Sequence, residues 1–246
     1  MVLQVPGPDT TAQQGTPGGR ASRPGRFLPG WATVLVVVAH PDDESFGLGA
    51  IISHMATAGA AAHILCYTHG EASTLNENRA DLDTEREAEL RHASTELAAA
   101  SLTLLGYSDG RLAATPLEEL TAHVTHLIAR HQPEGLLVFD DTGVTGHPDH
   151  QAATRAAAQA ATAAGLPVLA WALPAAIAGR LRAETGQPFT GHSPDRLDLC
   201  IRLDRTRQRR AALAHASQIS PAAVLWRRLQ LQGDCQHLRW LWPPHA

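Results

Sequence analysis

Residues 34–44 have the sequence Val34-Leu-Val-Val-Val-Ala-His-Pro-Asp-Asp-Glu44, in which an aliphatic run stops at a cluster of polar residues. Such a run of β-branched and aliphatic residues predicts a strand that is buried on both faces of a parallel sheet. Pro41 lacks a backbone N–H and cannot extend the strand, so the polar cluster should lie at the strand's carboxyl end. Ligands bind at that edge of open parallel sheets, and we expect a functional site there.

This polar cluster has the composition of a metal site. Residues 40–44 offer one imidazole and three carboxylates, and mixed nitrogen and oxygen ligands suit a borderline cation such as Zn²⁺. His40 and Asp43 are three positions apart in a turn, so both can face one ion. A second cluster, Gly146-His-Pro-Asp-His150, follows another expected strand and can supply the third ligand.

The two clusters also contain the groups that amide hydrolysis needs. Of the two adjacent aspartates in the first cluster, one would bind the ion and the other would act as general base toward water. Of the two histidines in the second cluster, one would be a ligand and the other an acid or an oxyanion stabiliser. The residues alone do not assign each role. A purely structural alternative is that the carboxylates form the first turn of a helix, where the helix dipole favours them.

The rest of the chain alternates expected strands with expected helices. Strands are expected at residues 34–39, 61–68, 102–105, 135–139, 167–171 and 197–203. Helices are expected at residues 45–58, 84–100, 116–131, after residue 150 and at 205–217. This alternation predicts right-handed crossovers between parallel strands. We therefore expect an α/β fold, Rossmann-like and three-layered, with a mostly parallel central sheet. Residues 173–195 receive no assignment, and the segment with the last tryptophans is expected to pack on the surface of the core.

Length and composition favour a single enzyme-sized domain. The chain has 246 residues, of which 44% are apolar, enough for one large core. Its net charge of −4 argues against nucleic acid as a partner. Residues 1–29 are rich in Gly, Pro, Thr and Gln and are expected to form a flexible tail before a single domain at 30–246. The chain has neither an apolar run of about 20 residues nor a signal peptide, so we expect a cytoplasmic protein without membrane contact.

The two polar clusters resemble a known family. Ala39-His-Pro-Asp-Asp-Glu44 followed by Gly146-His-Pro-Asp-His150 is similar to the motif pair of the PIG-L/LmbE-like family of zinc-dependent N-acetylglucosaminyl deacetylases. Supporting matches are Thr68-His-Gly-Glu71, Arg86-Glu-Ala-Glu-Leu90, Leu105-Gly-Tyr-Ser-Asp109 and Ala214-His-Ala-Ser-Gln218. The resemblance therefore extends over most of residues 32–218. It implies a Rossmann-like fold, a Zn²⁺ cofactor and removal of an N-acetyl group.

The resemblance also implies a role for each polar residue of the two clusters. The implied metal ligands are His40, Asp43 and His150. Asp42 would be the general base. His147 would be the charged stabiliser or acid, and Asp149 would tune it.

The resemblance also implies substrate-binding residues outside the two clusters. Arg79 matches an arginine that holds the sugar in mycothiol-pathway members, and Asp109 is expected to bind substrate as well. Those members have a tyrosine two residues before the first histidine of the second cluster, and this chain has Thr145 there. Either another group does that work or the substrate differs. In the structural alternative, Arg79 is a solvated charge and Asp109 only fixes a turn.

We therefore expect a zinc-dependent hydrolase that removes an N-acetyl group from an amino sugar or glycoconjugate. Its partner would be a small N-acetylated sugar, and assembly into a homo-oligomer is left open. The alternatives among enzymes are an amidase for a thiol-sugar conjugate and a deacetylase of an antibiotic intermediate. A nucleotide-binding module is disfavoured because the first turn lacks Gly-x-Gly-x-x-Gly and its carboxylates would repel phosphates. A catalytically silent scaffold is disfavoured because the polar residues of both clusters are intact.

Overall fold

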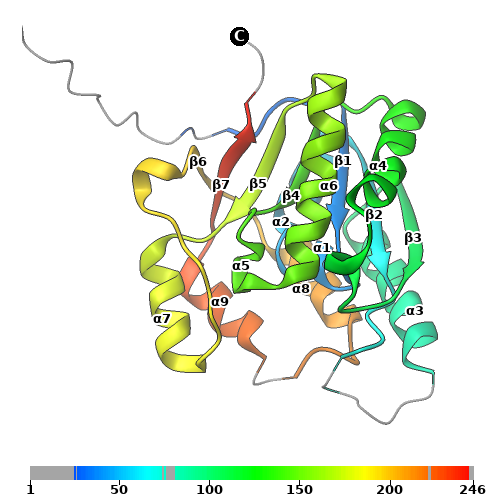
Figure 1. Ribbon diagram of the computed structural model, residues 1–246. Coiled ribbons are helices and arrows are strands. Elements are labelled where there is room, and N and C mark those ends of the chain that lie inside the picture. Colours follow the sequence, from blue (N-terminus) through cyan, green and yellow to red (C-terminus); the bar gives the residue numbers. More distant parts are fainter. Residues whose placement is uncertain (1–24, 26, 74, 76–80, 221–222, 244–246) are drawn as a thin grey trace, which may run out of the picture.

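The computed structural model describes residues 25, 27–73, 75, 81–220 and 223–243, and these residues form one sheet with helices on both sides (Figure 1). The strands are β1 Thr33–Val38, β2 Ala61–Thr68, β3 Ser101–Tyr107, β4 Gly135–Phe139, β5 Val168–Ala172, β6 Leu199–Arg202 and β7 Cys235–Trp242. The longer helices are α2 Gly49–Thr57, α3 Leu82–Glu96, α4 Leu117–His131, α6 Pro148–Ala164, α7 Ala175–Thr185, α8 Thr206–Ala214 and α9 Val224–Gln232. The single helical turns are α1 Asp43–Phe46, α5 Gly143–Gly146 and two 3₁₀ turns, Leu112–Ala114 and Pro194–Arg196.

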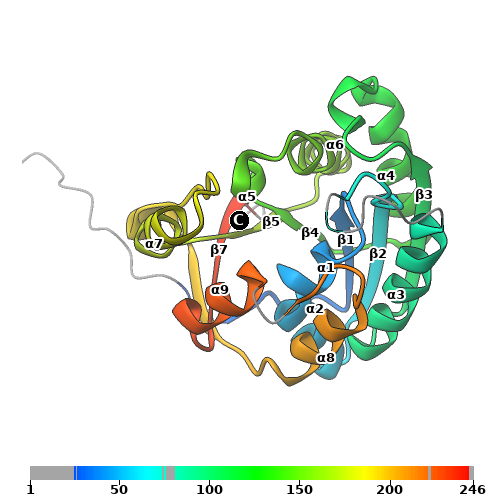
Figure 2. The ribbon, with the colours of Figure 1, turned by 90° about the horizontal axis from the view of Figure 1, so that it is seen from below.

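The sheet is mostly parallel, with the strand order β3-β2-β1-β4-β5-β7-β6. Strands β1 to β5 pair in parallel, whereas β7 is antiparallel to its neighbours β5 and β6. Helices α4 and α6 cover one face of the sheet, and α2, α3 and α8 pack on the other (Figure 2). The predicted fold class, an α/β Rossmann-like fold with three layers and a mostly parallel sheet, is confirmed.

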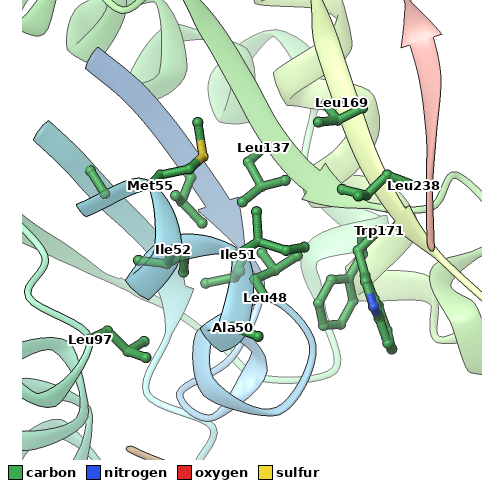
Figure 3. Packing of buried hydrophobic residues seen from close by; sticks show 14 of the residues in the cluster. Leu48, Ala50, Ile51, Ile52, Met55, Leu97, Leu137, Leu169, Trp171 and Leu238 are labelled. Atoms are coloured by element: carbon green, nitrogen blue, oxygen red, sulfur yellow. The ribbon is translucent and has the colours of Figure 1, made fainter. Parts of the chain in front are cut away.

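Strand β1 is central because it is buried on both faces, as its aliphatic run predicted. Val36 and Val38 contact the apolar cluster on the α2 side, and Leu35 and Val37 contact the one beneath α4 and α6. Figure 3 shows the α2 side of this core, where Ile51 and its apolar neighbours pack against the sheet. Burial on both faces fixes the position of the strand, and hence the position of the polar cluster at its end.

Strand β7 was not predicted, because polar residues interrupt its apolar pattern. The segment expected on the surface of the core instead lies inside the sheet, between β5 and β6. Two of its polar side chains have partners far away in the sequence. Gln236 accepts a hydrogen bond from Trp171 Nε1 at 2.9 Å, and Arg239 donates to Asp140 at 3.2 Å. A buried strand can carry polar residues when such partners exist, but sequence alone does not reveal them.

Most of the segment predicted to be a flexible tail, residues 1–24 and 26, lies outside the described residues. Gly25 is described and lies beside β6, where its N–H donates to Asp198 O and its carbonyl accepts from the N–H of Cys200. The domain boundary at residue 30 therefore stays a prediction. None of the helices in the described part of the chain is long and apolar enough to cross a membrane.

Glu44 and His215 form a buried pair that joins α1 to the end of α8. Both side chains are fully shielded from solvent, and Glu44 Oε1 lies 2.8 Å from His215 Nε2. Burial alone would lower the pKa of His215, but the charge and hydrogen bond of Glu44 outweigh burial and raise that pKa. Because Glu44 is the last residue of the polar cluster, this pair holds the cluster against α8.

We expect Glu44→Gln to lower the free energy of unfolding by about 3 kcal/mol, because it leaves His215 buried without its anionic partner. The raised pKa makes the stabilisation complete below about pH 6.5 and removes it as pH rises through the folded-state pKa. The difference between wild type and Glu44→Gln should thus be larger at pH 6 than at pH 9. Urea unfolding of metal-stripped protein at both pH values measures it.

The control for this experiment is Glu118→Gln, the same change at an exposed position in the first turn of α4. It should change the free energy of unfolding by less than about 1 kcal/mol at either pH. An equal loss of stability for both variants, or a Glu44→Gln effect that grows with pH, would contradict a charged Glu44–His215 pair.

Candidate active site

The turn after β1 folds Asp43 back against the end of the strand. Asp42 has a φ of 102°, a left-handed conformation that is costly for a residue other than glycine and often occurs at functional sites. Asp43 Oδ2 accepts hydrogen bonds from the backbone N–H groups of Ala39 at 3.2 Å and His40 at 2.9 Å. The same oxygen lies 3.6 Å from His40 Nδ1. The turn therefore places the imidazole and the carboxylate side by side.

His150 reaches the same point from the first turn of α6, which follows β4, the neighbour of β1. Its Nδ1 lies 3.1 Å from Gly143 O, and donation to that carbonyl leaves the lone pair on Nε2. This Nε2 lies 3.1 Å from Asp43 Oδ1 and 3.2 Å from His40 Nδ1. A lone pair that faces a carboxylate needs a proton or a cation between the two atoms. The tautomer of His150 thus suits a metal ligand.

The second nitrogen of His40 is held by two carboxylates. His40 Nε2 lies 3.0 Å from Asp109 Oδ1 and 3.3 Å from Asp149 Oδ2. Burial lowers the pKa of His40, but the hydrogen bonds with these carboxylates and with Asp43 raise it well above its usual value. Asp149 is fully buried and also accepts two backbone N–H groups from the loop after β3. Carboxylates commonly hold a metal-binding histidine in this way, which leaves Nδ1 as the ligand atom.

Three potential ligand groups therefore converge, namely His40 Nδ1, the Asp43 carboxylate and His150 Nε2. The two histidine nitrogens lie 3.2 Å apart, His150 Nε2 lies 3.1 Å from Asp43 Oδ1, and His40 Nδ1 lies 3.6 Å from the other oxygen, Oδ2. A tetrahedral zinc ion with bonds of about 2.0–2.2 Å places its ligand atoms about 3.3–3.6 Å apart. The burial of Asp43 would raise its pKa, but His150 and His40 hold that pKa well below the usual value. The spacing, donor atoms and charge of this ligand trio fit a zinc ion.

Two overlapping groups of side chains in the described part of the chain bring ligand atoms within 4.8 Å of one another. One contains His40, His147 and His150, and the other contains His40, Asp109 and Asp149. Each carboxylate oxygen of Asp149 already accepts a backbone N–H, so that group serves better to orient His40. The group of His40, His147 and His150, with the Asp43 carboxylate in contact with His150, is therefore the better candidate to hold a metal.

Asp42 lies beside the ligand trio and carries a raised pKa. Burial raises the pKa of its carboxyl group to about 6, although the charge of Arg86 acts in the opposite direction. Asp42 Oδ2 accepts a hydrogen bond from Arg86 Nη2 at 3.0 Å. A carboxylate whose pKa is close to neutral pH is well suited to accept a proton during catalysis.

Arg86 is a site residue whose contacts the sequence did not reveal. This arginine of α3 is 3% exposed and also donates to the carbonyl oxygens of Pro41 and Gly70. Gly70 has a φ of 69°, a conformation that favours glycine, and a Cβ atom there would also collide with the guanidinium group. Gly70 and Arg86 both lie in segments that supported the family resemblance, and these matches were the available signal. Arg86 fixes the turn that carries Asp42.

His147 is partly buried at the start of α6, beside the other two histidines. Its ring centroid lies 4.8 Å from those of His40 and His150. Its Nδ1 accepts the backbone N–H of Asp149 at 3.2 Å, which places the ring proton on Nε2. Burial and the charges of His40 and His150 lower the pKa of His147. The charge of Asp149 acts in the opposite direction, but its effect is smaller.

All predicted site residues except Arg79 lie together at this edge of the sheet, and Arg79 lies outside the described residues. Asp109, expected to bind substrate, contacts His40 and accepts the N–H of Ala72 at 3.1 Å. The carboxylate of Asp149, expected to tune His147, contacts His40 at 3.3 Å, and its charge also acts to raise the pKa of His147. The catalytic, metal-binding and substrate-binding roles remain predictions.

Comparison with known proteins identifies the family. The chain matches the family model described as "PIG-L: GlcNAc-PI de-N-acetylase" over residues 35–161. The 1D-myo-inositol 2-acetamido-2-deoxy-alpha-D-glucopyranoside deacetylase of Mycolicibacterium vanbaalenii is 32% identical over 232 residues, which cover 77% of this chain and 81% of the relative. A deacetylase of the same name, numbered 1, from Catenulispora acidiphila is 33% identical over 162 residues, covering 56% of this chain. This chain spans only 50% of that second relative's length.

Solved structures share the fold at lower identity. The 4-carboxy-2-hydroxymuconate hydratase GalB from Pseudomonas putida has a TM-score of 0.65 and 19% identity, covering 87% of this chain and 98% of GalB. The A40926 pseudoaglycone deacetylase Dbv21 has a TM-score of 0.64 and 21% identity, covering 87% of this chain and 98% of Dbv21. These likenesses show the fold alone, and the hydratase illustrates that this fold hosts more than one activity. The family match, together with the M. vanbaalenii relative, carries the assignment: the chain belongs to the PIG-L family.

Proposed function

We propose that the protein is a zinc-dependent hydrolase that removes an N-acetyl group from an amino sugar or glycoconjugate. The observation that carries the proposal is the convergence of His40 Nδ1, the Asp43 carboxylate and His150 Nε2 at separations of 3.1 to 3.6 Å. The names of the relatives support an N-acetylated sugar as the substrate, because the M. vanbaalenii protein is a deacetylase of an acetamido sugar linked to inositol.

His40, Asp43 and His150 would hold the zinc ion. When bound, zinc supplies Lewis-acid polarisation of a carbonyl oxygen and acidifies water. Asp109 and Asp149 orient His40 through its Nε2, and Gly143 orients His150 through its Nδ1. These contacts set both tautomers before the ion arrives, which reduces the cost of ordering the ligands.

Asp42 would act as the general base. Its carboxylate takes the proton of the attacking water as the oxygen of that water bonds to the acetyl carbon. The raised pKa of Asp42, about 6, makes the carboxylate a stronger base than an ordinary aspartate while it remains ionised at neutral pH. Arg86 keeps the carboxylate in place through its hydrogen bond to Oδ2.

His147 would act as the general acid toward the nitrogen of the scissile amide. Its Nδ1 is engaged by the backbone N–H of Asp149, so Nε2 is the atom that can hold a proton toward the substrate. Donation from Nε2 to the departing nitrogen releases the amine, while the carbonyl carbon leaves as acetate. Burial lowers the pKa of His147 despite the opposing charge of Asp149, and a lower pKa makes the ring proton easier to donate. We retain Asp109 and Arg79 as the proposed substrate-binding residues.

The domain organisation, the cellular location and the alternative substrates are further parts of this proposal. Described residues from β1 to β7 contribute to one sheet, which supports a single domain at 30–246. The predicted cytoplasmic location and any homo-oligomer remain predictions. Deacetylation of an antibiotic intermediate is the second candidate function, since the fold also resembles that of Dbv21. The amidase for a thiol-sugar conjugate remains an alternative prediction.

Acetate release from N-acetylated sugars tests the proposed reaction. Zinc-loaded protein should release acetate from N-acetylglucosaminyl-inositol, N-acetylglucosamine or diacetylchitobiose, because the site joins a metal, a base and an acid. A chelator should abolish release, and added zinc should restore it. Release that persists at full rate after metal removal, or no release from any acetamide by fully loaded protein, would contradict the proposal.

Two substitutions should separate metal binding from proton transfer. Asp42→Asn should retain zinc at about one ion per chain but lower kcat by about 10²–10⁴-fold, because the base is lost. His150→Ala should lose most of the zinc, because a ligand is removed. Zinc content by atomic emission and kcat on the best acetamide measure both effects. Asp83→Asn, an exposed position in α3, is the matched control and should change neither. A fully active Asp42→Asn variant would refute the base assignment.

A further inference from the structure

The turn between β4 and α6 has a strained backbone and contacts a proposed metal ligand. Gly143 has a φ of 72° and Val144 a φ of 63°. A left-handed conformation is unfavourable for a β-branched residue such as valine and persists only where surrounding contacts hold it. The carbonyl oxygen of Gly143 in this turn lies 3.1 Å from His150 Nδ1. The tautomer and direction of the His150 ring therefore depend on the contacts that hold the turn.

Asp140 shapes the start of this turn. It is the first residue after β4 and is almost fully buried. Its Oδ1 accepts the backbone N–H of Thr142 at 3.0 Å, and its carbonyl oxygen accepts the N–H of Gly143 at 2.8 Å. The hydroxyl oxygen of Thr142 then accepts the N–H of Val144 at 3.3 Å. A buried carboxylate is costly without partners, so the shape of the turn depends on what compensates Asp140.

Two side chains from distant segments compensate Asp140. His192, between α7 and β6, places Nε2 2.7 Å from Asp140 Oδ2, and Arg239 of β7 donates through Nη1 to the same oxygen at 3.2 Å. The same Nη1 also donates to Asp141 Oδ1 at 2.8 Å. Arg239 thereby bridges two adjacent carboxylates that would otherwise repel each other. Burial and the charge of Asp140 raise the pKa of Asp141, and the charge of Arg239 acts in the opposite direction.

The segment that carries His192 also holds the far end of the turn. The N–H of Thr190 donates to the carbonyl oxygen of Val144 at 2.6 Å. Thr190 and His192 belong to residues 173–195, for which the sequence predicted no element, and Arg239 belongs to β7, which was not predicted either. The strained turn is therefore fixed at both ends by segments that follow both polar clusters in the sequence.

We propose that a clamp of three side chains positions His150 for the metal. The clamp consists of Asp140, His192 and Arg239, and Arg239 is the positioning residue that joins β7 to the site. The inference rests on the proposed role of His150 as a zinc ligand. The three side chains belong to neither candidate ligand group in the described part of the chain, so the clamp acts on the ion through the turn. Contacts behind a metal ligand commonly contribute about 10–100-fold to metal affinity.

Arg239→Met tests the clamp, because it removes the charge and keeps the aliphatic part of the side chain. Without the guanidinium the two adjacent carboxylates repel each other, and the turn should hold His150 less precisely. The zinc Kd of the folded protein should rise about tenfold, measured by competition with a chromophoric chelator. Arg91→Met is the matched control, since Arg91 also pairs with a carboxylate, Glu87, but lies on the exposed surface of α3. It should change the zinc Kd less than about threefold.

A purely structural role of Arg239 predicts a different pattern. Arg239→Met would then lower the free energy of unfolding of the metal-free protein but leave the zinc Kd of the folded protein unchanged, and that result would contradict the clamp. Arg239→Lys should restore the zinc Kd to within about threefold of wild type, because a single nitrogen, Nη1, makes both carboxylate contacts in the native side chain. A zinc Kd for Arg239→Lys as weak as that of Arg239→Met would also count against the clamp. His192→Ala removes the other partner of Asp140 and should raise the zinc Kd at least about threefold, so this variant tests the clamp if Arg239→Met does not fold.

The variant His150→Ala separates failure of this inference from failure of the proposed site. All affinities are measured without substrate, so the result does not depend on hydrolysis. If His150→Ala loses zinc but Arg239→Met and His192→Ala bind it as tightly as wild type, the clamp is overturned and the proposed site stands. If His150→Ala itself retains wild-type affinity, His150 is not a ligand, and the proposed site fails together with the clamp. Loss of zinc in His150→Ala with about tenfold weaker binding in Arg239→Met supports both.

Discussion

The carboxylate of Asp43 is the group on which the rest of the site depends. One of its oxygens accepts two backbone N–H groups at the end of β1, and the other faces His150. This double role fixes a buried anion to a strand that is buried on both faces and aims it at two imidazoles. A buried anion needs such partners, and the histidines supply them here. The histidines of the candidate metal centre thus also stabilise the buried negative charge of Asp43 at the end of β1.

The order of the strands explains how two clusters a hundred residues apart in the sequence meet. Because β4 pairs with β1 in parallel, the carboxyl ends of both strands lie at the same edge, and the loop after β4 delivers His147 and His150 there. The loop after β3 adds Asp109, which together with Asp149 of α6 holds His40 from its other side. Arg86 from α3 then fixes the turn between His40 and Asp43. Each element contributes one constraint to the same few side chains.

The sequence predicted those parts of the structure that depend on local pattern. The aliphatic run before His40 and the alternation of strands and helices were sufficient for the fold class, and the two clusters indicated the edge of the sheet where the candidate site residues lie together. What could not be predicted depends on contacts between distant residues. The polar pattern of β7 concealed a strand inside the sheet, because the partner of the Gln236 side-chain oxygen is Trp171, 65 positions away in the sequence. In the same way, the contact between the Asp149 carboxylate and His40 joins residues 109 positions apart in the sequence.

The position of the metal tests this account most directly. Crystals grown with zinc and measured on both sides of the zinc absorption edge locate the ion without reference to activity. The account predicts one strong anomalous peak about 2.0–2.2 Å from His40 Nδ1, an Asp43 oxygen and His150 Nε2, with Asp42 near but not bonded. A peak at His40 Nε2 between Asp109 and Asp149, or no peak at the end of β1, would contradict it.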